Sequence, residues 1–226
     1  MTGLNNCQVH CVYSNNTKQK TNMISRFART GIICKYYYSN NPTNDRAAEF
    51  TCGDHLHMIR EFYYDTTMSY GIFCEAEIHI HKDLGEIMTK ILSDFNVLNL
   101  DVLLLGYHIP FIADEIMLAT EFPLKRYTRS HAKYKYHNYP YDVIGKQMYI
   151  ISRNHAKYIL DKYYTGYINN TLIDDTGVPF SLSDFIITCD GNKALISPAL
   201  AVVNTKNNSE LGVKGKNFKY NIENFT

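Results

Sequence analysis

The feature that most constrains the fold of this chain is an alternation of short apolar runs with amphipathic helical segments. In the clearest example, a strand-like run at 71–80 is followed by a segment with helical periodicity and then by a continuous apolar run at 101–107. Because a strand buried on both faces has a continuous apolar sequence, the second run predicts a strand inside a mostly parallel sheet. Asp83, with Glu86 three residues later, predicts a capping box at the start of the intervening helix. The apolar positions of that helix are Leu84, Ile87, Met88, Ile91, Leu92 and Phe95.

The same alternation extends along most of the chain. We expect further strands at 8–14, 32–39, 146–152 and 194–203, and helices around 23–28, 55–63 and 156–163. Strands that alternate with helices predict a single α/β domain of Rossmann-like type over residues 1–203, with a mostly parallel central sheet flanked by helices. Ligands of such domains bind at the carboxyl ends of the strands. The Asn- and Lys-rich segment 204–226 is expected to be a peripheral tail.

The composition excludes several classes of protein. The 226 residues are 45% hydrophobic and 20% charged, which predicts a globular domain with a sizeable core rather than a disordered chain. The formal charge of +1 provides no global basic field, so we expect no nucleic-acid partner. No apolar run approaches the roughly 20 residues of a membrane span, and the first residues do not resemble a signal peptide, so a cytoplasmic location is expected. The six cysteines form no CxxC pair and are expected to be free, mostly buried thiols.

Absent motifs narrow the range of functions further. The chain has no GxGxxG after its first strand, no GxxxxGK[ST], no GxSxG and no HExxH. Dinucleotide oxidoreductases, P-loop NTPases, serine hydrolases of the common fold and zincins are therefore disfavoured. A nucleotide could still bind by other means.

The stretch CEAEIHIH at 74–81 carries the most informative side chains. On a continuous strand, Glu75, Glu77, His79 and His81 share one face, which would present carboxylates and imidazoles together. That combination of ligands suits a divalent metal such as Mn²⁺. The alternative is an ordinary amphipathic edge strand with a solvated face.

Three other places contain candidate functional groups. The segment around Tyr134, Tyr136 and Tyr139 interleaves aromatic with basic residues, so its rings could stack on sugars or bases, or they could pack back on the body of the domain. Two residues apart on a helix, the rings of His55 and His57 diverge, which predicts one packed and one solvated histidine. Asp184 precedes an apolar run and is either a residue of a helix N-terminus or a carboxylate held where it can act as a base.

The order of these segments resembles the family 25 glycosyltransferases, the group that includes bacterial lipooligosaccharide and collagen galactosyltransferase-like proteins. In that family a Gly-Cys-x-x-Ser-His helix leads to a strand ending in Glu-Asp-Asp, then to a helix and an Asp-x-Leu-Leu-Leu-Gly strand. Residues 50–107 follow this order. GKQMYIISRNHAKYIL at 145–160 and SLSDFIITCDGNKALISPALAVV at 181–203 are similar to later segments of the family, so the resemblance covers roughly residues 8–203.

The resemblance implies a GT-A fold, a nucleotide-sugar donor with a UDP-sugar as first choice, a glycan or glycoprotein acceptor and a divalent metal, commonly Mn²⁺. Glu75 and Glu77 match the outer acidic positions, so Glu75 is expected at the nucleotide sugar and Glu77 would hold the metal, with Glu75 and His79 as further candidate ligands. Asp184 matches the late aspartate and would be the base of an inverting transfer. The remaining matched or neighbouring positions are Ser14, Asn15 and Arg26, expected at the nucleotide, and Gly145, Lys146 and Gln147, expected beside the nucleotide sugar and the acceptor.

The chain departs from the family pattern at the acidic motif. Ala76 occupies the middle acidic position, Glu77 replaces an aspartate, and His55 follows Asp54 where Ser-His is expected. Three alternatives to a metal-dependent glycosyltransferase therefore stay open. The domain could bind sugar or nucleotide without turnover, it could be a structural or interaction domain, or it could be a metal-independent transferase in which Lys146 neutralises the diphosphate.

Overall fold

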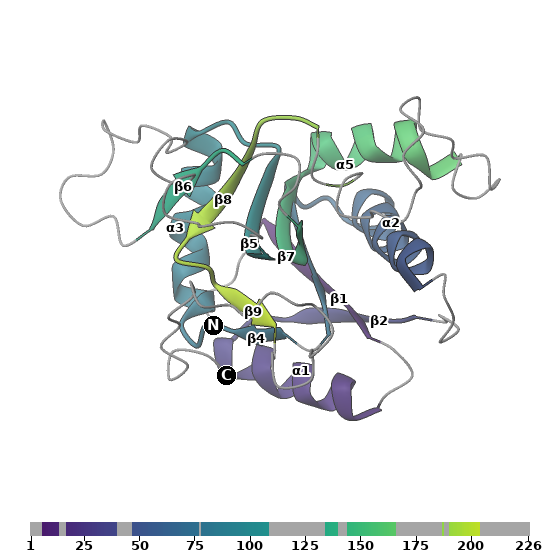
Figure 1. The fold of residues 1–226 in the computed structure, drawn as a ribbon, viewed down its shortest axis with the longest axis vertical. Helices are drawn as coiled ribbons and strands as arrows, with labels where there is room; N and C mark the ends of the chain where they lie inside the picture. The colour runs from purple at the N-terminus through teal and green to yellow at the C-terminus, as the bar shows by residue number, and fades with distance from the viewer. Residues whose placement is uncertain are drawn as a thin grey trace.

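A computed structural model describes residues 6–13, 17–39, 47–76, 78–108, 134–139, 144–165, 187 and 190–203. Its centre is a seven-stranded sheet in the order β2-β1-β3-β7-β5-β8-β6 (Figure 1). The strands are β1 (Cys7–Tyr13), β2 (Cys34–Tyr38), β3 (Tyr70–Glu75), β5 (Val102–His108), β6 (Lys135–His137), β7 (Ile144–Ser152) and β8 (Lys193–Ser197). Among them only β6 and β7 run antiparallel to their neighbours, so the expected mostly parallel sheet is confirmed.

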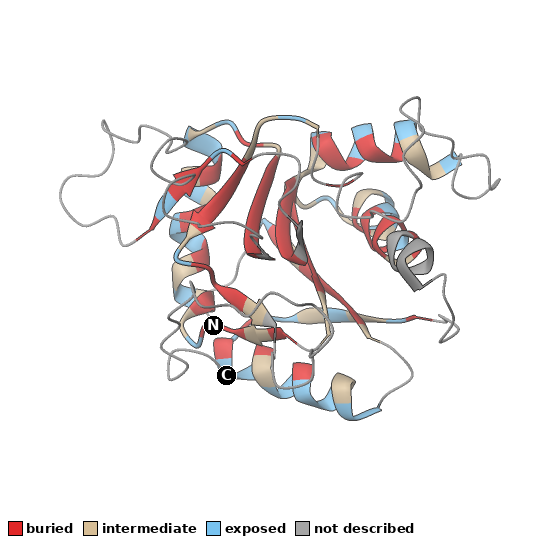
Figure 2. Ribbon diagram, viewed as in Figure 1, coloured by how far each residue is buried: buried red, intermediate tan, exposed pale blue. Residues whose placement is uncertain are grey.

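Helices cover both faces of this sheet, as the sequence predicts. Helices α1 (Thr17–Thr30) and α3 (Leu84–Val97) pack on one face, and their apolar side chains join one hydrophobic cluster with the side chains of Cys74 and Met148. The second cluster lies on the other face. There α2 (Ala47–Asp65) and α5 (Arg153–Ile159), which continues into the π-helical turn η1 (Leu160–Tyr164), pack against Phe73 and Tyr149. Figure 2 shows buried residues concentrated in the strands between these two layers.

A second, two-stranded sheet pairs β4 (Ile78–Ile80) with β9 (Ala201–Val203). The prediction of one strand over 71–80 is therefore wrong, because β3 ends at Glu75 and a turn at Ala76 redirects the chain. Ala76 N donates to Val12 O over 2.8 Å, next to the end of β1, so the chain beyond it has no further partner on β1. The run at 194–203 is likewise divided into β8 and β9, at the cis peptide bond Ser197–Pro198.

The expected capping box at the start of α3 does not form. Asp83 occupies the N-cap position, but its backbone has φ −93° and ψ 16°, and its side chain caps no backbone N–H. The reason is a preceding turn, in which Leu84 N donates to His81 O over 2.9 Å and Asp83 N donates to His81 Nδ1 over 3.2 Å. This turn holds Asp83 away from the extended conformation that a capping side chain needs.

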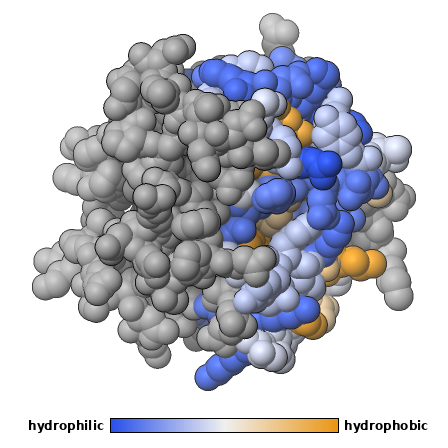
Figure 3. Space-filling model, turned by 90° about the vertical axis from the view of Figure 1, so that its right-hand side faces the viewer, coloured by the Kyte–Doolittle hydropathy of each residue, from blue (hydrophilic) through white to orange (hydrophobic). Residues whose placement is uncertain are grey.

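The thiols and the surface agree with the expected globular domain. Cys7, Cys11 and Cys74 are free and buried, and Cys34 is free and half-buried. Figure 3, which faces the right-hand side of Figure 1, shows a mostly hydrophilic surface with isolated apolar groups over the described residues. No helix of the described ranges combines the length and the hydropathy needed to cross a bilayer. The tail at 204–226 lies outside the described residues, so the boundary at 203 stays a prediction.

His10 makes the stability of this fold dependent on pH. Its ring is fully buried between Tyr37 and Phe73, with ring centroids 5.5 and 5.0 Å away, and its Nδ1 lies 2.7 Å from the Tyr37 hydroxyl. Burial, and then the nearby positive charge of Lys35, lower the pKa of His10 to about 3. The unfolded chain therefore binds a proton at His10 below about pH 6.5, which the folded chain does not bind until pH approaches 3.

We expect this histidine to reduce the free energy of unfolding by about 1.4 kcal/mol for each pH unit below 6.5. The His10→Phe variant keeps an aromatic ring at the site and removes that contribution, so its stability should fall less steeply between pH 6.5 and 4.5. Urea unfolding of both proteins at several pH values measures the difference in slope. Equal slopes in this range would contradict the prediction, whereas equal slopes between pH 7 and 8 are its internal control.

Candidate donor-binding site

The candidate site lies at the carboxyl ends of β1, β2 and β3, where an α/β sheet binds its ligands. Ser39, directly after β2, connects the ends of β1 and β2 to α2. Its backbone N–H donates to Tyr13 O over 2.8 Å, and its hydroxyl donates to Asp54 Oδ2 of α2 over 2.5 Å. The first half of α2 is therefore held against the ends of the first two strands. The next residue of α2, His55, brings the helix into contact with β3 and β7.

His55 is the centre of a polar group at the end of β3. Its side chain is fully buried, its Nδ1 lies 2.7 Å from the Tyr149 hydroxyl, and the two rings stack with centroids 5.6 Å apart. Its Nε2 is 4.0 Å from Glu75 Oε1, which makes an ion pair only when the imidazole is protonated. The Glu75 side chain is 28% exposed, so its carboxylate lies at the boundary between this buried group and solvent.

Gln147 joins this group through the strand register. Cys74 of β3 is opposite Met148 of β7, and Phe73 is opposite Tyr149. Glu75 and Gln147 are the next positions beyond the pair of Cys74 and Met148, and because side chains alternate along a strand, both lie on the face of Phe73 and Tyr149. We call His55, Glu75, Gln147 and Tyr149 the Glu75 cluster. It contains two of the residues that the sequence predicts at the nucleotide sugar.

The metal-binding prediction is only partly addressed by the described residues. Because the chain turns at Ala76, His79 lies on β4 opposite Val202, in a different sheet from Glu75. The two side chains therefore do not share one strand face, and that part of the prediction is wrong. Glu77 lies outside the described residues. Among the residues that are described, no three His, Cys, Asp or Glu side chains are arranged to hold a metal. Carboxylate and imidazole ligands still fit Mn²⁺ chemically, so the manganese site stays a prediction.

Arg26, predicted at the nucleotide, holds the connection between β3 and β4. Its Nη1 donates to Ile78 O over 2.5 Å and lies 3.6 Å from Met23 Sδ on the preceding turn of α1. Arg26 is therefore beside the start of β4, on the α1 side of the sheet. Its contact with a nucleotide stays a prediction.

The three tyrosines expected at the acceptor are buried. Tyr134, Tyr136 and Tyr139 are 5%, 1% and 4% exposed, and the first two belong to the hydrophobic cluster on the α1 and α3 side. The Tyr136 hydroxyl donates to Asp94 Oδ2 over 2.7 Å, and burial, together with this carboxylate, raises the pKa of Tyr136. The rings therefore pack on the body of the domain, which is the alternative that the sequence left open, and they offer no exposed stacking surface.

The histidine pair follows its expected pattern, since His55 is buried and His57 is exposed. Four predicted site residues lie outside the described residues, namely Ser14, Asn15, Glu77 and Asp184. Gly145 and Lys146 belong to β7, but only their backbone is described.

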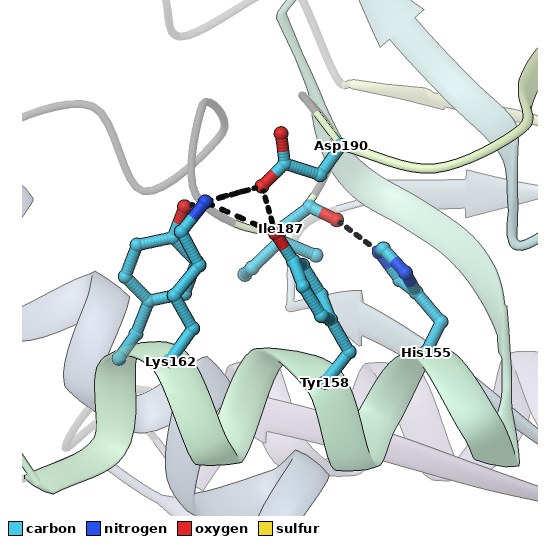
Figure 4. A network of polar contacts seen from close by, with 6 residues as sticks. His155, Tyr158, Lys162, Ile187 and Asp190 are labelled. Carbon is cyan, nitrogen blue, oxygen red and sulfur yellow. Dashed lines mark hydrogen bonds and ion pairs between the residues drawn. The ribbon is translucent and has the colours of Figure 1, made fainter.

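A polar network that the sequence analysis missed lies farther along the chain from Asp184 (Figure 4). Asp190 Oδ2 accepts hydrogen bonds from the Tyr158 hydroxyl over 2.9 Å, from Lys162 Nζ over 2.8 Å and from the Tyr163 hydroxyl over 3.4 Å. Partial burial opposes ionisation of Asp190, but hydrogen bonds from Lys162 and Tyr158 outweigh it and lower its pKa. The network fixes residue 190 against α5 and η1. Its only sequence signal is the four-residue spacing of Tyr158 and Lys162 on a helix.

Comparisons with known proteins found structural likeness at low identity. A glycosyltransferase involved in the glycosylation of the major capsid of PBCV-1 aligns with a TM-score of 0.49 and 10% identity, over 87% of this chain and 94% of that chain. A protein from STIV aligns with a TM-score of 0.46 and 11% identity, over 83% and 81% of the two chains. A UDP-glucose pyrophosphorylase complexed with UDP-glucose aligns with a TM-score of 0.30 and 11% identity, over 69% and 62%. No family model and no curated protein matches the sequence.

Proposed function

We propose that this chain is a glycosyltransferase that moves a sugar from a nucleoside diphosphate sugar, with a UDP-sugar as first choice, to a hydroxyl group of a glycan or glycoprotein. One observation carries the proposal. Positions that the family resemblance assigns to the donor come from separate blocks of the sequence, and they lie on the two faces of the sheet near the end of β3. Glu75 ends that strand, and Gln147 lies on the neighbouring β7, next to the partner of Cys74. On the other face, Arg26 donates to the backbone of Ile78 just beyond β3.

The proposed reaction uses a base and a leaving group on opposite sides of the donor sugar. Asp184 takes the proton from the acceptor hydroxyl as its oxygen forms a bond to the anomeric carbon. The bond from that carbon to the diphosphate breaks, and the nucleoside diphosphate leaves with the bonding electrons, so the transfer inverts the anomeric centre. Arg26 is close enough to the β3–β4 connection to add positive charge near the diphosphate. A divalent metal held by Glu77 and His79 would supply further charge stabilisation there.

Donor binding tests this function directly. We expect isothermal titration with a panel of nucleotide sugars to show one donor that binds in the presence of Mn²⁺ and is bound weakly without it. Glu77→Ala should abolish the metal-dependent part, because it removes the carboxylate proposed to hold the ion. Glu86→Ala, at an exposed position in the first turn of α3, is the matched control and should bind as the wild type does.

The outcomes of this titration separate the alternatives. Donor binding that depends neither on metal nor on the Glu77 side chain would favour a metal-independent enzyme over the metal-dependent one. The absence of binding to every donor would overturn the proposed function.

A second candidate is a domain that binds the nucleotide sugar without transferring it, and Ala76 favours it. At the middle position of the acidic motif this residue provides a methyl group, which packs against the hydrophobic cluster on the α1 and α3 side. The site therefore lacks one carboxylate of the family pattern. Donor binding combined with neither transfer nor hydrolysis, under any divalent metal, would support this candidate over the enzyme.

A further inference from the structure

The carboxamide oxygen of Gln147 is a buried acceptor without a partner. The residue is 6% exposed, and within the described part of the chain its Oε1 has no hydrogen-bond donor. A buried polar atom in this state reduces the stability of the fold, and nearly all such atoms in folded proteins have a partner. Gln147 lies at the end of the sheet where ligands bind, so we infer that a group of the ligand donates the missing hydrogen bond.

The surroundings of Gln147 favour a hydroxyl group of a sugar as that donor. Glu75 and Gln147 directly follow Cys74 and Met148, the last pair of the β3–β7 ladder, and they lie on the same face of these neighbouring strands. Side chains placed in this way on adjacent strands have Cβ atoms about 5 Å apart. A carboxylate and a carboxamide oxygen at this spacing can accept hydrogen bonds from hydroxyls on neighbouring carbon atoms. Tyr149 and His55 lie on the buried side of Glu75, so a ligand has to approach Glu75 from the carboxyl end of β3.

The position of β7 in the sheet separates the sugar from the nucleoside. The nucleoside is proposed at the end of β1, beside Ser14 and Asn15. In the strand order β1-β3-β7, Gln147 lies two strand spacings away, which is roughly 10 Å along the edge. A group bound there belongs to the part of the donor beyond the diphosphate.

We propose that Gln147, together with Glu75, recognises the sugar of the donor, with the carboxamide oxygen accepting a hydrogen bond from one of its hydroxyl groups. This inference rests on the proposed function. It makes the donor a nucleotide-linked sugar with adjacent free hydroxyls, and it makes Gln147 a residue that determines specificity. A site built around such an acceptor discriminates against a sugar that lacks the hydroxyl, because the acceptor then stays unpaired.

The test compares Gln147→Leu with a matched variant, Gln8→Leu. Gln8 is a half-buried residue of β1, five positions before the carboxyl end of that strand, and its carboxamide oxygen is also buried without a partner. Both substitutions remove an unpaired acceptor, so both should raise Tm by about 2 to 4 °C. Only Gln147→Leu should weaken binding of the nucleotide sugar, by about tenfold, while both variants bind free UDP as tightly as the wild type does.

Each result of the titrations has one meaning. Equal affinity of wild type and Gln147→Leu for the nucleotide sugar would overturn the inference and leave the proposed function standing. An equal loss of affinity for UDP and for the nucleotide sugar would also overturn it, because Gln147 would then contact the nucleotide. If the wild type binds no nucleotide sugar, the proposed function fails together with this inference. A tenfold loss confined to the sugar-bearing ligand supports it.

Discussion

Asp184→Asn is expected to slow sugar transfer by a factor of roughly 100 to 10,000, the range by which a positioned general base accelerates a reaction. Asparagine has nearly the shape of aspartate but cannot take the proton from the acceptor hydroxyl. Donor binding should be unchanged, because the proposed donor contacts come from Glu75, Gln147 and Arg26. Transfer rates measured at saturating donor, with donor affinity from titration, separate these two effects.

The nearby aspartate provides the control for this experiment. Asp190 is held by Tyr158 and Lys162 on α5 and η1, and we assign it a structural role. Asp190→Asn keeps most of these contacts and should change the transfer rate only slightly. If Asp190→Asn slowed transfer as much as Asp184→Asn, the assignment of the base would be wrong.

The second large effect concerns stability. Gly85→Ala is expected to lower the free energy of unfolding by about 3 kcal/mol, or Tm by roughly 6 to 12 °C for a chain of this size. Gly85 lies in the first turn of α3 and faces the end of α1. A Cβ atom there would be 2.1 Å from the carbonyl oxygen of Thr30, a backbone atom that cannot move aside without shifting a helix. Thermal unfolding followed by circular dichroism measures the change.

Gly31→Ala, next to Thr30 in the sequence, is the control that separates the effect of the steric clash from the effect of replacing a glycine. Gly31 has φ +69°, and no atom lies within 4 Å of the position that an alanine Cβ would take, so Gly31→Ala introduces backbone strain and no clash. Its expected cost is about 1 to 2 kcal/mol. If Gly85→Ala lowered the free energy of unfolding no more than Gly31→Ala does, α1 and α3 could separate at little cost.

Local sequence patterns were sufficient for much of the fold. The helical spacing of Leu84 to Phe95 predicted α3, because a helix buries one face at its own period. The continuous apolar run at 101–107 predicted β5, because a strand buried on both faces is apolar throughout. The break between β3 and β4 could not be predicted in this way. It depends on where β1 ends and on the presence of β9 as a partner more than 120 residues later, which leaves no local signal.

The candidate site shows the same division between local and distant information. Glu75 was singled out by its carboxylate in the stretch 74–81 and by the match to the acidic motif of the family, and the contrast between buried His55 and exposed His57 followed from helix geometry. The resemblance placed Gln147 at the nucleotide sugar, but neither the contact of the Tyr149 hydroxyl with His55 nor the buried, unpaired oxygen of Gln147 was predictable. Their position depends on the antiparallel register of β3 and β7, which joins segments about 75 residues apart.

The place of β7 between β3 and β5 also bears on how the protein is made. In chain order β1, β2, β3, β5 and β6 precede β7, so β3 and β5 both lack their β7 partner until residue 152 has been synthesised. Exposed strand edges of this kind are the usual starting points of aggregation. Because β7 pairs with both strands, the edges that β3 and β5 turn toward each other are covered only when this later segment is in place.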